Sequence, residues 1–520
     1  MAVASYTTDL VDITQAESLT NFTAIGGGGS GLNVEQEYFI QSTACISKNG
    51  WNNTSQRGFI YDAGTAYNVD SGSAIFYWGV WTAPNALNSQ STGGFQCLAG
   101  TGDAAFNSYY VRGADTYTYG GWFNIPIDPI AATADTTVGT PGASTNWDSI
   151  GVRVIQNGNV TKGSPLGMDA VRHGRRIFVA DGEVGAYGTF EGSATANDLQ
   201  NNRWGLFQAI DGGYLQQGIF QIGTAVTACD FRDSNRSISI ANTEKVSPSF
   251  NRFEFINTGT NVEWATINIS ALGTNSRGDF KITDNVTGSF IQCGFADMGT
   301  FTLNANSVFD RCTWRGVDKI IQTSGVLDSC VINGSTTVAG EAFIIADTPS
   351  LISNCTFEYS AGHAIELENT GTFTFTGNKF TNFTGNNTSG SALFNNSGGA
   401  VTASIAGGGG AVTVRNSAGS TTLILNQTAV TVANLKDNTE VRVLSGSTFP
   451  QVELAGIENA TDGTTNNRSF TFTLDAGVVV DIAYISLAYQ NERTNNFTIP
   501  GVDTTIPVSQ RIDRNYSNPA

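Results

Sequence analysis

A six-residue pattern of apolar and polar positions recurs through the middle of the chain. It runs apolar-x-x-Cys-x-apolar, and the clear copies begin at Phe290, Phe309, Leu327 and Ile352. Weaker copies flank these, and they begin at Val226, Phe250, Ile267 and Phe375. Successive fourth positions lie 17 to 25 residues apart, which is the period of a solenoid.

Stacked coils explain this pattern, because one coil cannot bury its apolar side alone. Positions four and six share one strand face, whereas position one has the opposite parity, so we expect a kink between positions one and four. A leucine-rich horseshoe has a similar period, but leucine is sparse here, and the abundance of Thr, Asn, Gly, Val and Phe favours all-β coils. We predict a right-handed parallel β-helix over residues 206–403.

The cysteines follow the same repeat. We expect five of the seven to form a ladder in the core of the coils, namely Cys229, Cys293, Cys312, Cys330 and Cys355. We expect packed thiols, because stacked strands rarely offer disulfide geometry. There is no CxxC or HExxH motif, no phosphate loop and no dinucleotide fingerprint, so we predict no metal site and no cofactor.

Two further all-β domains are predicted to flank the coils. Residues 1–205 contain six of the eight tryptophans and strand-like runs such as Ala74–Trp81, which predict a β-sandwich or jelly roll. The glycines at 26–29 resemble a flexible linker, so residues 1–25 are expected to form a separate arm. Residues 404–520 begin with a low-complexity stretch and continue with alternating runs, which predict a β-sandwich that caps the coils.

Composition restricts the partners. Charged residues make up 13% of the chain, against about 25% in an average soluble protein, and 26 basic and 44 acidic residues give a net charge of -18. This charge argues against binding to nucleic acid or an anionic membrane. The N-terminus lacks a secretory signal, and the most apolar stretch, 476–489, is interrupted by Asp481, so no membrane insertion is expected.

One pair of carboxylates is a candidate for glycoside chemistry. Asp310 and Asp328 occupy equivalent positions of adjacent repeats, so they should stack about 4.8 Å apart, and repulsion should raise the pKa of one of them. Such a pair is a potential acid and base. The favoured alternative is an exposed corner beside Arg311. The looser acidic candidates are Glu254, Glu358, Glu366 and Glu368.

Two other clusters are candidates for ligand binding. The densest group of charges comprises Asp169, Arg172, His173, Arg175, Arg176, Asp181 and Glu183. It is suited to binding an acidic sugar or a carboxylate on a partner subunit, although a local salt-bridge network is the favoured interpretation. The second cluster comprises Tyr109, Tyr110, Tyr117, Tyr119 and Trp122. Such rings stack on sugars, although core packing is favoured.

The whole chain, with its Gly, Asn, Thr and Ser-rich surface, few charges and capped β-helix, resembles virion proteins of tailed bacteriophages, especially tailspikes, fibres and head decorations. The C-terminal stretch from Glu440-Val441-Arg442 through 455–458 to 513–519 is similar to the ends of structural proteins from environmental and marine phages.

This resemblance implies a non-enzymatic structural protein on the exterior of a virion, made in the host cytoplasm and released by lysis. It is either a capsid-surface fibre or decoration, or a spike or fibre at the tail periphery. The alternative is a receptor-binding tailspike that binds or cleaves host polysaccharide. The implied partners are other virion proteins, a host surface glycan and two further copies of the chain. The resemblance also implies that the first domain or its arm, residues 1–25, anchors the chain to the particle. A homotrimer would bury a coil face that includes Val331, Ile344 and Ile345.

Overall fold

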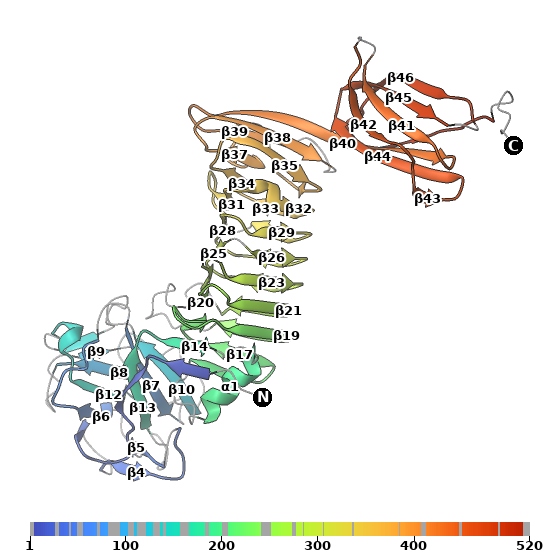
Figure 1. The fold of residues 1–520 in the computed structure, drawn as a ribbon. Coiled ribbons are helices and arrows are strands. Elements are labelled where there is room, and N and C mark those ends of the chain that lie inside the picture. The colour runs from blue at the N-terminus through green and yellow to red at the C-terminus, as the bar shows by residue number, and fades with distance from the viewer. Residues whose placement is uncertain are drawn as a thin grey trace. The chain divides into compact units, whose positions relative to one another are not determined.

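A computed structural model of the chain is built almost entirely of β-strands and divides into two compact units, Met1–Ser307 and Val308–Ala520 (Figure 1). The predicted all-β class, with sandwich domains and a parallel β-helix, is confirmed. The structure describes residues 5–25, 31–40, 43–48, 56–69, 73–81, 94–101, 109–111, 121–127, 136–138, 142–155, 166–181, 187–199, 206–240, 251–272, 277–283, 285–304, 306–334, 337–383, 385–406, 412–446, 450–486 and 489–512.

The first unit begins with a β-sandwich. One sheet has the order β10-β7-β13-β5-β4, made of Gly121–Ile127, Ala74–Trp81, Leu166–Gly174, Cys45–Lys48 and Asn33–Glu35. The other has the order β11-β9-β8-β12-β6-β3, made of Thr136–Val138, Tyr109–Val111, Gly94–Gly100, Ser149–Ile155, Gln56–Asp62 and Phe22–Ile25. Both contribute apolar residues to one core around Trp147, beside the 3-10 turn Ser144–Asn146.

The N-terminal residues are part of the sandwich sheets and of one coil sheet. β1 (Ser5–Thr8) pairs with β14 (Ile177–Asp181), and β2 (Val11–Thr14) pairs with β13. β3 pairs with β6. The prediction that residues 1–25 form a separate arm is therefore wrong for residues 5–25, because their backbone groups complete the sheet ladders.

Parallel coils follow in the same unit. One coil face has the order β14-β18-β20-β22-β25, where the last four strands are Ile219–Ile222, Arg252–Phe255, Asp279–Ile282 and Thr300–Leu303. The other face contains β15, β19, β21, β23 and β24, which are Tyr187–Gly188, Asp230–Ile240, Asn261–Ala271, Thr287–Ile291 and Gly294–Ala296. The coils begin at β14, before the predicted boundary at residue 206.

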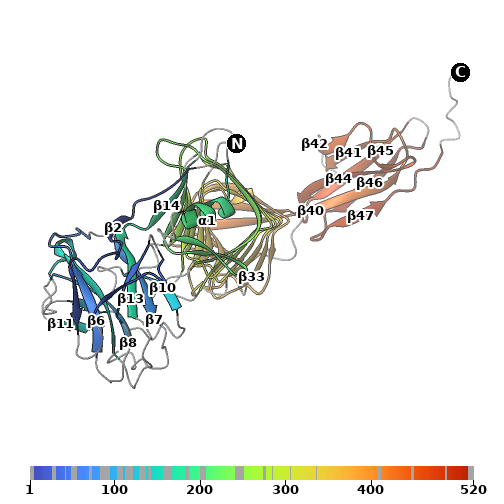
Figure 2. The ribbon, with the colours of Figure 1, turned by 90° about the horizontal axis from the view of Figure 1, so that it is seen from below.

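A helix covers the first coil. In Figure 2, α1 (Phe190–Leu199) crosses in front of the coils of this unit. Its first residue, Phe190, is fully buried and lies 5.0 Å from Phe231 and 5.2 Å from Trp264 between ring centroids. The hairpin of β16 (Phe207–Ile210) and β17 (Gly213–Gln216) pairs with β19 beside it. This end of the apolar core is therefore covered.

The second unit also contains parallel coils. One face has the order β28-β31-β34-β37-β39, made of Lys319–Gln322, Ala342–Ala346, His363–Leu367, Leu393–Asn395 and Val414–Asn416. The other face has the ladders β26-β29-β32 and β27-β30-β33-β36, made of Ser307–Asp310, Val326–Asp328, Ile352–Ser353, Thr313–Arg315, Val331–Gly334, Thr356–Ser360 and Lys379–Phe380. A 3-10 turn, Pro349–Leu351, precedes β32.

A left-handed residue produces the expected kink in each clear repeat. The residue before the cysteine has φ of 54° at Gln292, 53° at Arg311, 55° at Ser329 and 54° at Asn354. The strand breaks at this position, because a left-handed residue turns the chain out of the extended conformation. The kink predicted between positions one and four is confirmed.

The register corrects the weaker upstream copies. Trp264 pairs with Phe290 and Ile269 with Phe295, so the true copy in that coil begins at Trp264 and not at Ile267. Phe253 lies on the other coil face, in β20. All five predicted ladder cysteines are buried and free, but Cys229 precedes β19 and therefore stands in a different column from the other four. The spacing of the repeat along the sequence does not show on which coil face a residue lies.

One long strand joins the coils to the C-terminal sandwich. The first half of β40 (Thr421–Leu435) pairs in parallel with β38 (Ala400–Ala406), which pairs with β35 (Gly371–Thr376). Its second half pairs with β44 and β47, and β43 extends that sheet, with bounds Asn467–Asp475, Thr504–Pro507 and Asp462–Thr464. The predicted boundary at residue 404 therefore falls inside a coil strand.

The second sheet of this sandwich has the order β42-β41-β45-β46, made of Glu453–Ile457, Glu440–Ser445, Val479–Ile485 and Glu492–Thr498. Valines of β40, β41 and β45 share one core. Among the described residues, no helix is long and apolar enough to cross a membrane.

Candidate functional site

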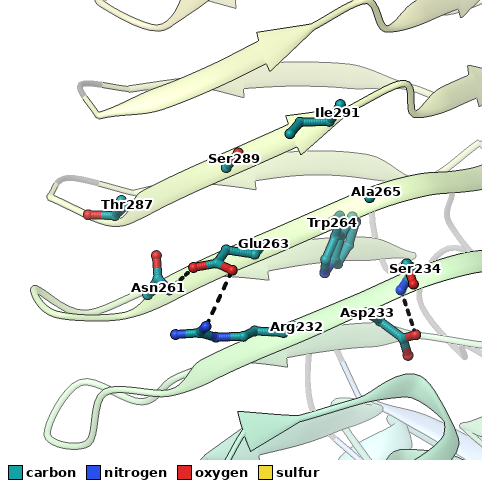
Figure 3. Close-up of a pocket in the computed structure, with 10 residues that line it drawn as sticks. All are labelled: Arg232, Asp233, Ser234, Asn261, Glu263, Trp264, Ala265, Thr287, Ser289 and Ile291. Atoms are coloured by element: carbon teal, nitrogen blue, oxygen red, sulfur yellow. Dashed lines mark hydrogen bonds and ion pairs between the residues drawn. The ribbon is translucent and has the colours of Figure 1, made fainter.

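A shallow groove of about 620 Å³ lies on the flank of the coils in the first unit (Figure 3). Strands β19, β21 and β23 run parallel, so residues of matched register form columns across them. Because alternate side chains point outward, three such columns face the solvent. From β19 to β23 the columns are Asp230, Asn261 and Thr287; Arg232, Glu263 and Ser289; and Ser234, Ala265 and Ile291.

Arg232 connects two carboxylates in this groove. Its Nε and Nη2 each donate to Asp230 at 2.8 Å, and its Nη1 lies 3.4 Å from Glu263. The Nδ2 of Asn261 donates to both carboxylates, at 3.2 Å and 3.1 Å. Hydrogen bonding to Asp230 raises the pKa of the Arg232 guanidinium. The groove therefore offers carboxylate acceptors and a fixed cation.

Tyr187 extends the first column by one rung. It pairs in parallel register with Asp230, and its side chain is 56% exposed. The guanidinium carbon of Arg232 lies 5.3 Å from the ring centroid. A cation on one ring face leaves the other face available. An exposed aromatic ring therefore borders the polar columns.

The floor of the groove is rigid. Trp264, which is 1% exposed, packs edge to face against Phe290 at 5.5 Å and an interplanar angle of 90°. The ring centroid of Phe255 lies 5.4 Å from that of Trp264. Close-packed rings resist displacement, so the strands above them hold their side chains at fixed spacing.

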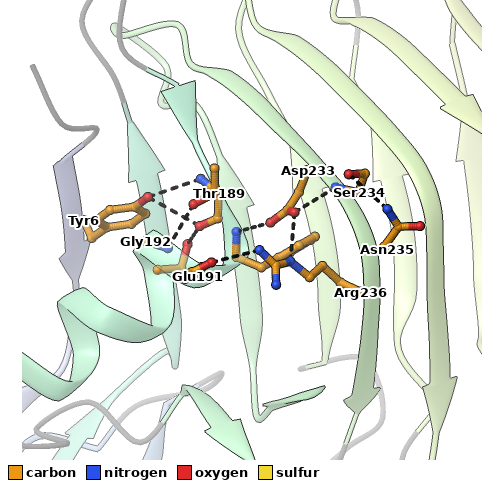
Figure 4. A network of polar contacts seen from close by, with 10 residues as sticks. Tyr6, Thr189, Glu191, Gly192, Asp233, Ser234, Asn235 and Arg236 are labelled. Atoms are coloured by element: carbon orange, nitrogen blue, oxygen red, sulfur yellow. Dashed lines mark hydrogen bonds and ion pairs between the residues drawn. The ribbon is translucent and has the colours of Figure 1, made fainter. Parts of the chain in front are cut away.

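The polar network beside the groove anchors helix α1 (Figure 4). Asp233 accepts a hydrogen bond from the backbone nitrogen of Phe190 at 2.8 Å and forms an ion pair with Arg236 at 3.0 Å. Arg236 also pairs with Glu191 of the helix at 3.0 Å. Thr189 accepts from the backbone nitrogen of Gly192 at 2.9 Å. These contacts satisfy backbone N–H groups of the first helical turn, and the acidic side chains interact favourably with the positive end of the helix dipole.

Asp310 and Asp328 pair in register as expected, but their surroundings are not those of an acid and base. Asp310 forms an ion pair with Arg311 at 2.7 Å. Asp328 accepts from the hydroxyl of Ser353 at 2.6 Å and from Asn354 at 2.8 Å. These hydrogen bonds lower the pKa of Asp328 instead of raising it. Asp328 is therefore held in its ionised form.

The predicted arginine cluster braces the N-terminal strands. Arg172 is 1% exposed and forms an ion pair with Asp12 at 2.7 Å. Arg175 is paired with Asp9 at 3.2 Å. Arg176 is fully buried, and Asp169 accepts from the backbone nitrogen of Ile40 at 2.6 Å. Because Arg172 and Arg176 are buried, neither is accessible to an acidic ligand. Residue 183 lies outside the described part of the chain.

The predicted aromatic cluster is divided between two sheets. Tyr109 and Tyr110 belong to β9, which pairs with β8 and β11, whereas Trp122 belongs to β10, which pairs with β7 of the other sheet. Tyr117 and Tyr119 lie outside the described residues. The structure therefore does not place these five residues on one strand pair.

His363 is a buried structural residue. Its Nδ1 donates to the carbonyl of Ser391 at 2.8 Å, and its Nε2 accepts from Arg415 at 3.3 Å, since a carbonyl can only accept and a guanidinium can only donate. Burial lowers the pKa of His363, so the imidazole is neutral. No cluster of three or more His, Cys, Asp or Glu residues that could hold a metal occurs in the described ranges.

The groove was not predicted from the sequence. Its residues come from three coils separated by unequal intervals, and they share no motif. One signal was present: Arg232 and Glu263 lie one coil apart, as do Glu263 and Ser289. This spacing can be recognised only when the strand register is known, and the copy wrongly placed at Ile267 gave a wrong register for this coil.

Comparison with known proteins gives distant structural likenesses only. No family model and no curated protein matches the chain. A Family 11 Carbohydrate-Binding Module from Clostridium thermocellum is 14% identical, with a TM-score of 0.21, over 33% of this chain and 96% of that one. The Agl-KA catalytic domain is 10% identical, with a TM-score of 0.21, over 81% of this chain and 98% of that one. At these TM-scores, neither likeness carries an argument about function.

Proposed function

We propose that the protein is a non-enzymatic structural component on the exterior of a tailed-bacteriophage virion, as a capsid-surface fibre or decoration or a tail-peripheral spike or fibre. The observation that carries this proposal is the covering of the coils within each unit. Helix α1 covers the coils in the first unit, and β40 continues from coil into sandwich in the second. Covered coil ends avoid edge-to-edge aggregation, so the architecture suits a rigid element exposed to solvent.

Mass spectrometry of density-purified particles tests this proposal. We expect the chain to copurify with infectious particles at a fixed ratio to the major capsid protein, and to be cleaved by protease added to intact particles. A chain found only in the soluble lysate would overturn the proposal.

A homotrimer belongs to the same proposal, with a smaller interface than the sequence suggested. Ile344 is fully buried in the coil core and cannot serve as an outer contact. Val331 is 37% exposed, and Ile345 is half-buried on the outer side of β31. Analytical ultracentrifugation of the full chain is expected to give three times the monomer mass, and a monomer at micromolar concentration would contradict the trimer.

The groove favours a second candidate function, which is binding of a host surface glycan without cleavage. Carboxylate, amide and hydroxyl groups recur across three strands, roughly 4.8 Å apart from rung to rung. A regular array of acceptors and donors suits the repeated hydroxyl groups of a polysaccharide. A glycan array probed with the full chain tests this candidate, and binding that is unchanged in an Asn261→Ala, Ser289→Ala double variant would remove it.

A further inference from the structure

We infer that the groove selects a neutral or amine-bearing glycan, rejects an acidic one, and uses Tyr187 as the stacking platform for a sugar ring. This inference rests on the glycan-binding candidate and assigns its ligand class. Three observations carry it: the exposed ring of Tyr187, the commitment of the groove's arginines, and the charge that remains.

The ring of Tyr187 is exposed and positioned to stack on a sugar ring. It lies one rung from Asp230 in the same column, so a chain that follows the column passes from the ring to the carboxylate. Its side chain is 56% exposed, although Arg232 occupies one face. An aromatic ring presents an apolar face that suits the C–H face of a pyranose, while its hydroxyl remains in water.

Neither nearby arginine is free to receive an acidic ligand. Arg232 is held by Asp230, Glu263 and the ring of Tyr187. Arg236 is held by Asp233 and Glu191 and lies 5.9 Å from the ring centroid of Tyr214. Binding a ligand carboxylate would require one of these contacts to break, and it would leave a protein carboxylate without its cation.

The remaining charge opposes anions. Four carboxylates and two guanidinium groups leave a net charge of about -2 around the groove. The third strand adds only Thr287, Ser289 and Ile291, which carry no charge. A uronate or phosphate group would be repelled, whereas a protonated amine or a hydroxyl group finds acceptors in Asp230 and Glu263.

The test is affinity electrophoresis of the full chain in gels that contain dextran, chitosan oligosaccharide or hyaluronan. We expect retardation by dextran or chitosan oligosaccharide and none by hyaluronan. Tyr187→Ala should weaken retardation about tenfold, the loss expected when an aromatic stacking contact with the ligand is removed. Tyr187→Phe should retain it. The matched control is Phe39→Ala, because Phe39 is also exposed, at 41%, and is not one of the residues that line the groove.

The outcomes separate this inference from the proposals on which it rests. Retardation by hyaluronan, or retardation by the other glycans that is equal in Tyr187→Ala and wild type, overturns the inference but leaves glycan binding in place. No retardation by any of the three overturns the inference, and the glycan array then decides whether the chain binds another glycan. Neither result bears on the presence of the chain in virions.

Discussion

At the scale of single residues, carboxylates on the same coils differ because their surroundings differ. Asp328 receives three hydrogen bonds, from Ser353, Asn354 and Ser329, which lower its pKa. Glu366 lies half-buried on β34, and burial raises its pKa despite a hydrogen bond from Asn396. Sequence repetition identified the position of Asp328 but not the direction of its pKa shift, because two of its three hydrogen-bond donors, Ser353 and Asn354, belong to the next coil.

Asp328→Asn is expected to lower the unfolding temperature at neutral pH. A carboxyl whose pKa is lower in the folded state contributes stability above its ordinary value of 3.8, and this contribution is lost as the pH falls through the folded value. Thermal unfolding followed by circular dichroism should therefore show a difference between variant and wild type that shrinks with acid. A difference that grows with acid would contradict this assignment.

Glu366→Gln is expected to have the opposite effect. Because the folded pKa is raised, the ionised side chain costs stability at neutral pH, and this cost disappears below the ordinary value of 4.5. The variant should unfold at a higher temperature than wild type at neutral pH and at the same temperature in acid. A variant that is less stable at neutral pH would show that Glu366 has a stabilising partner.

At the scale of elements, parity within the repeat correctly predicted a kink in each coil. The left-handed residue at the kink could not be recognised from its residue type, because the four residues have unrelated side chains: Gln292, Arg311, Ser329 and Asn354. Coil lengths also vary, so the pattern assigned the cysteine column in the clear copies but misplaced Ile267 and Cys229. Register is fixed by backbone pairing between coils, and spacing along one chain does not contain it.

Gln292→Val tests the left-handed kink. A β-branched residue at φ of 54° is expected to cost about 1–2 kcal/mol, whereas Gln292→Gly should be tolerated. Thr287→Val is the matched control, because Thr287 is exposed in an ordinary strand conformation. Urea unfolding should rank the valine variant at 292 below the control. Equal midpoints for the two valine variants would argue against a strained kink.

Asn378 is a buried side chain that connects two coils through hydrogen bonds. It is 1% exposed, accepts from the backbone nitrogen of Cys355 at 2.9 Å and donates to the carbonyl of Ile352 at 2.7 Å. Asn378→Ala should cost about 1–3 kcal/mol, because two buried backbone groups lose their partner. The control is Asn369→Ala, at an exposed position. If both variants unfold at the wild-type midpoint, the hydrogen bonds of Asn378 are not stabilising.

At the scale of the whole molecule, the sequence predicted the succession of sandwich, coils and sandwich. It did not predict that residues 5–25 pair with strands of the sandwich and of a coil sheet, or that β40 belongs to both coil and sandwich. Pairing between strands distant in sequence leaves no local pattern along the chain. The groove was missed for a similar reason: Tyr187, Arg232 and Glu263 meet only through coil register.

Because the chain is proposed to bind glycan without cleaving it, incubation with host capsule or lipopolysaccharide should release no new reducing ends. The Asp310→Asn, Asp328→Asn double variant should behave identically, since Arg311, Ser353 and Asn354 already occupy these carboxylates. Reducing ends that accumulate with wild type and disappear with the double variant would establish a hydrolase at this position.

Immunogold electron microscopy of intact particles tests the central claim most directly. Antibody raised against the full chain should place gold on the outside of unbroken virions, either on the capsid surface or along the tail periphery. Gold that appears only after particles are disrupted, or that is absent from them, would contradict an exterior structural role.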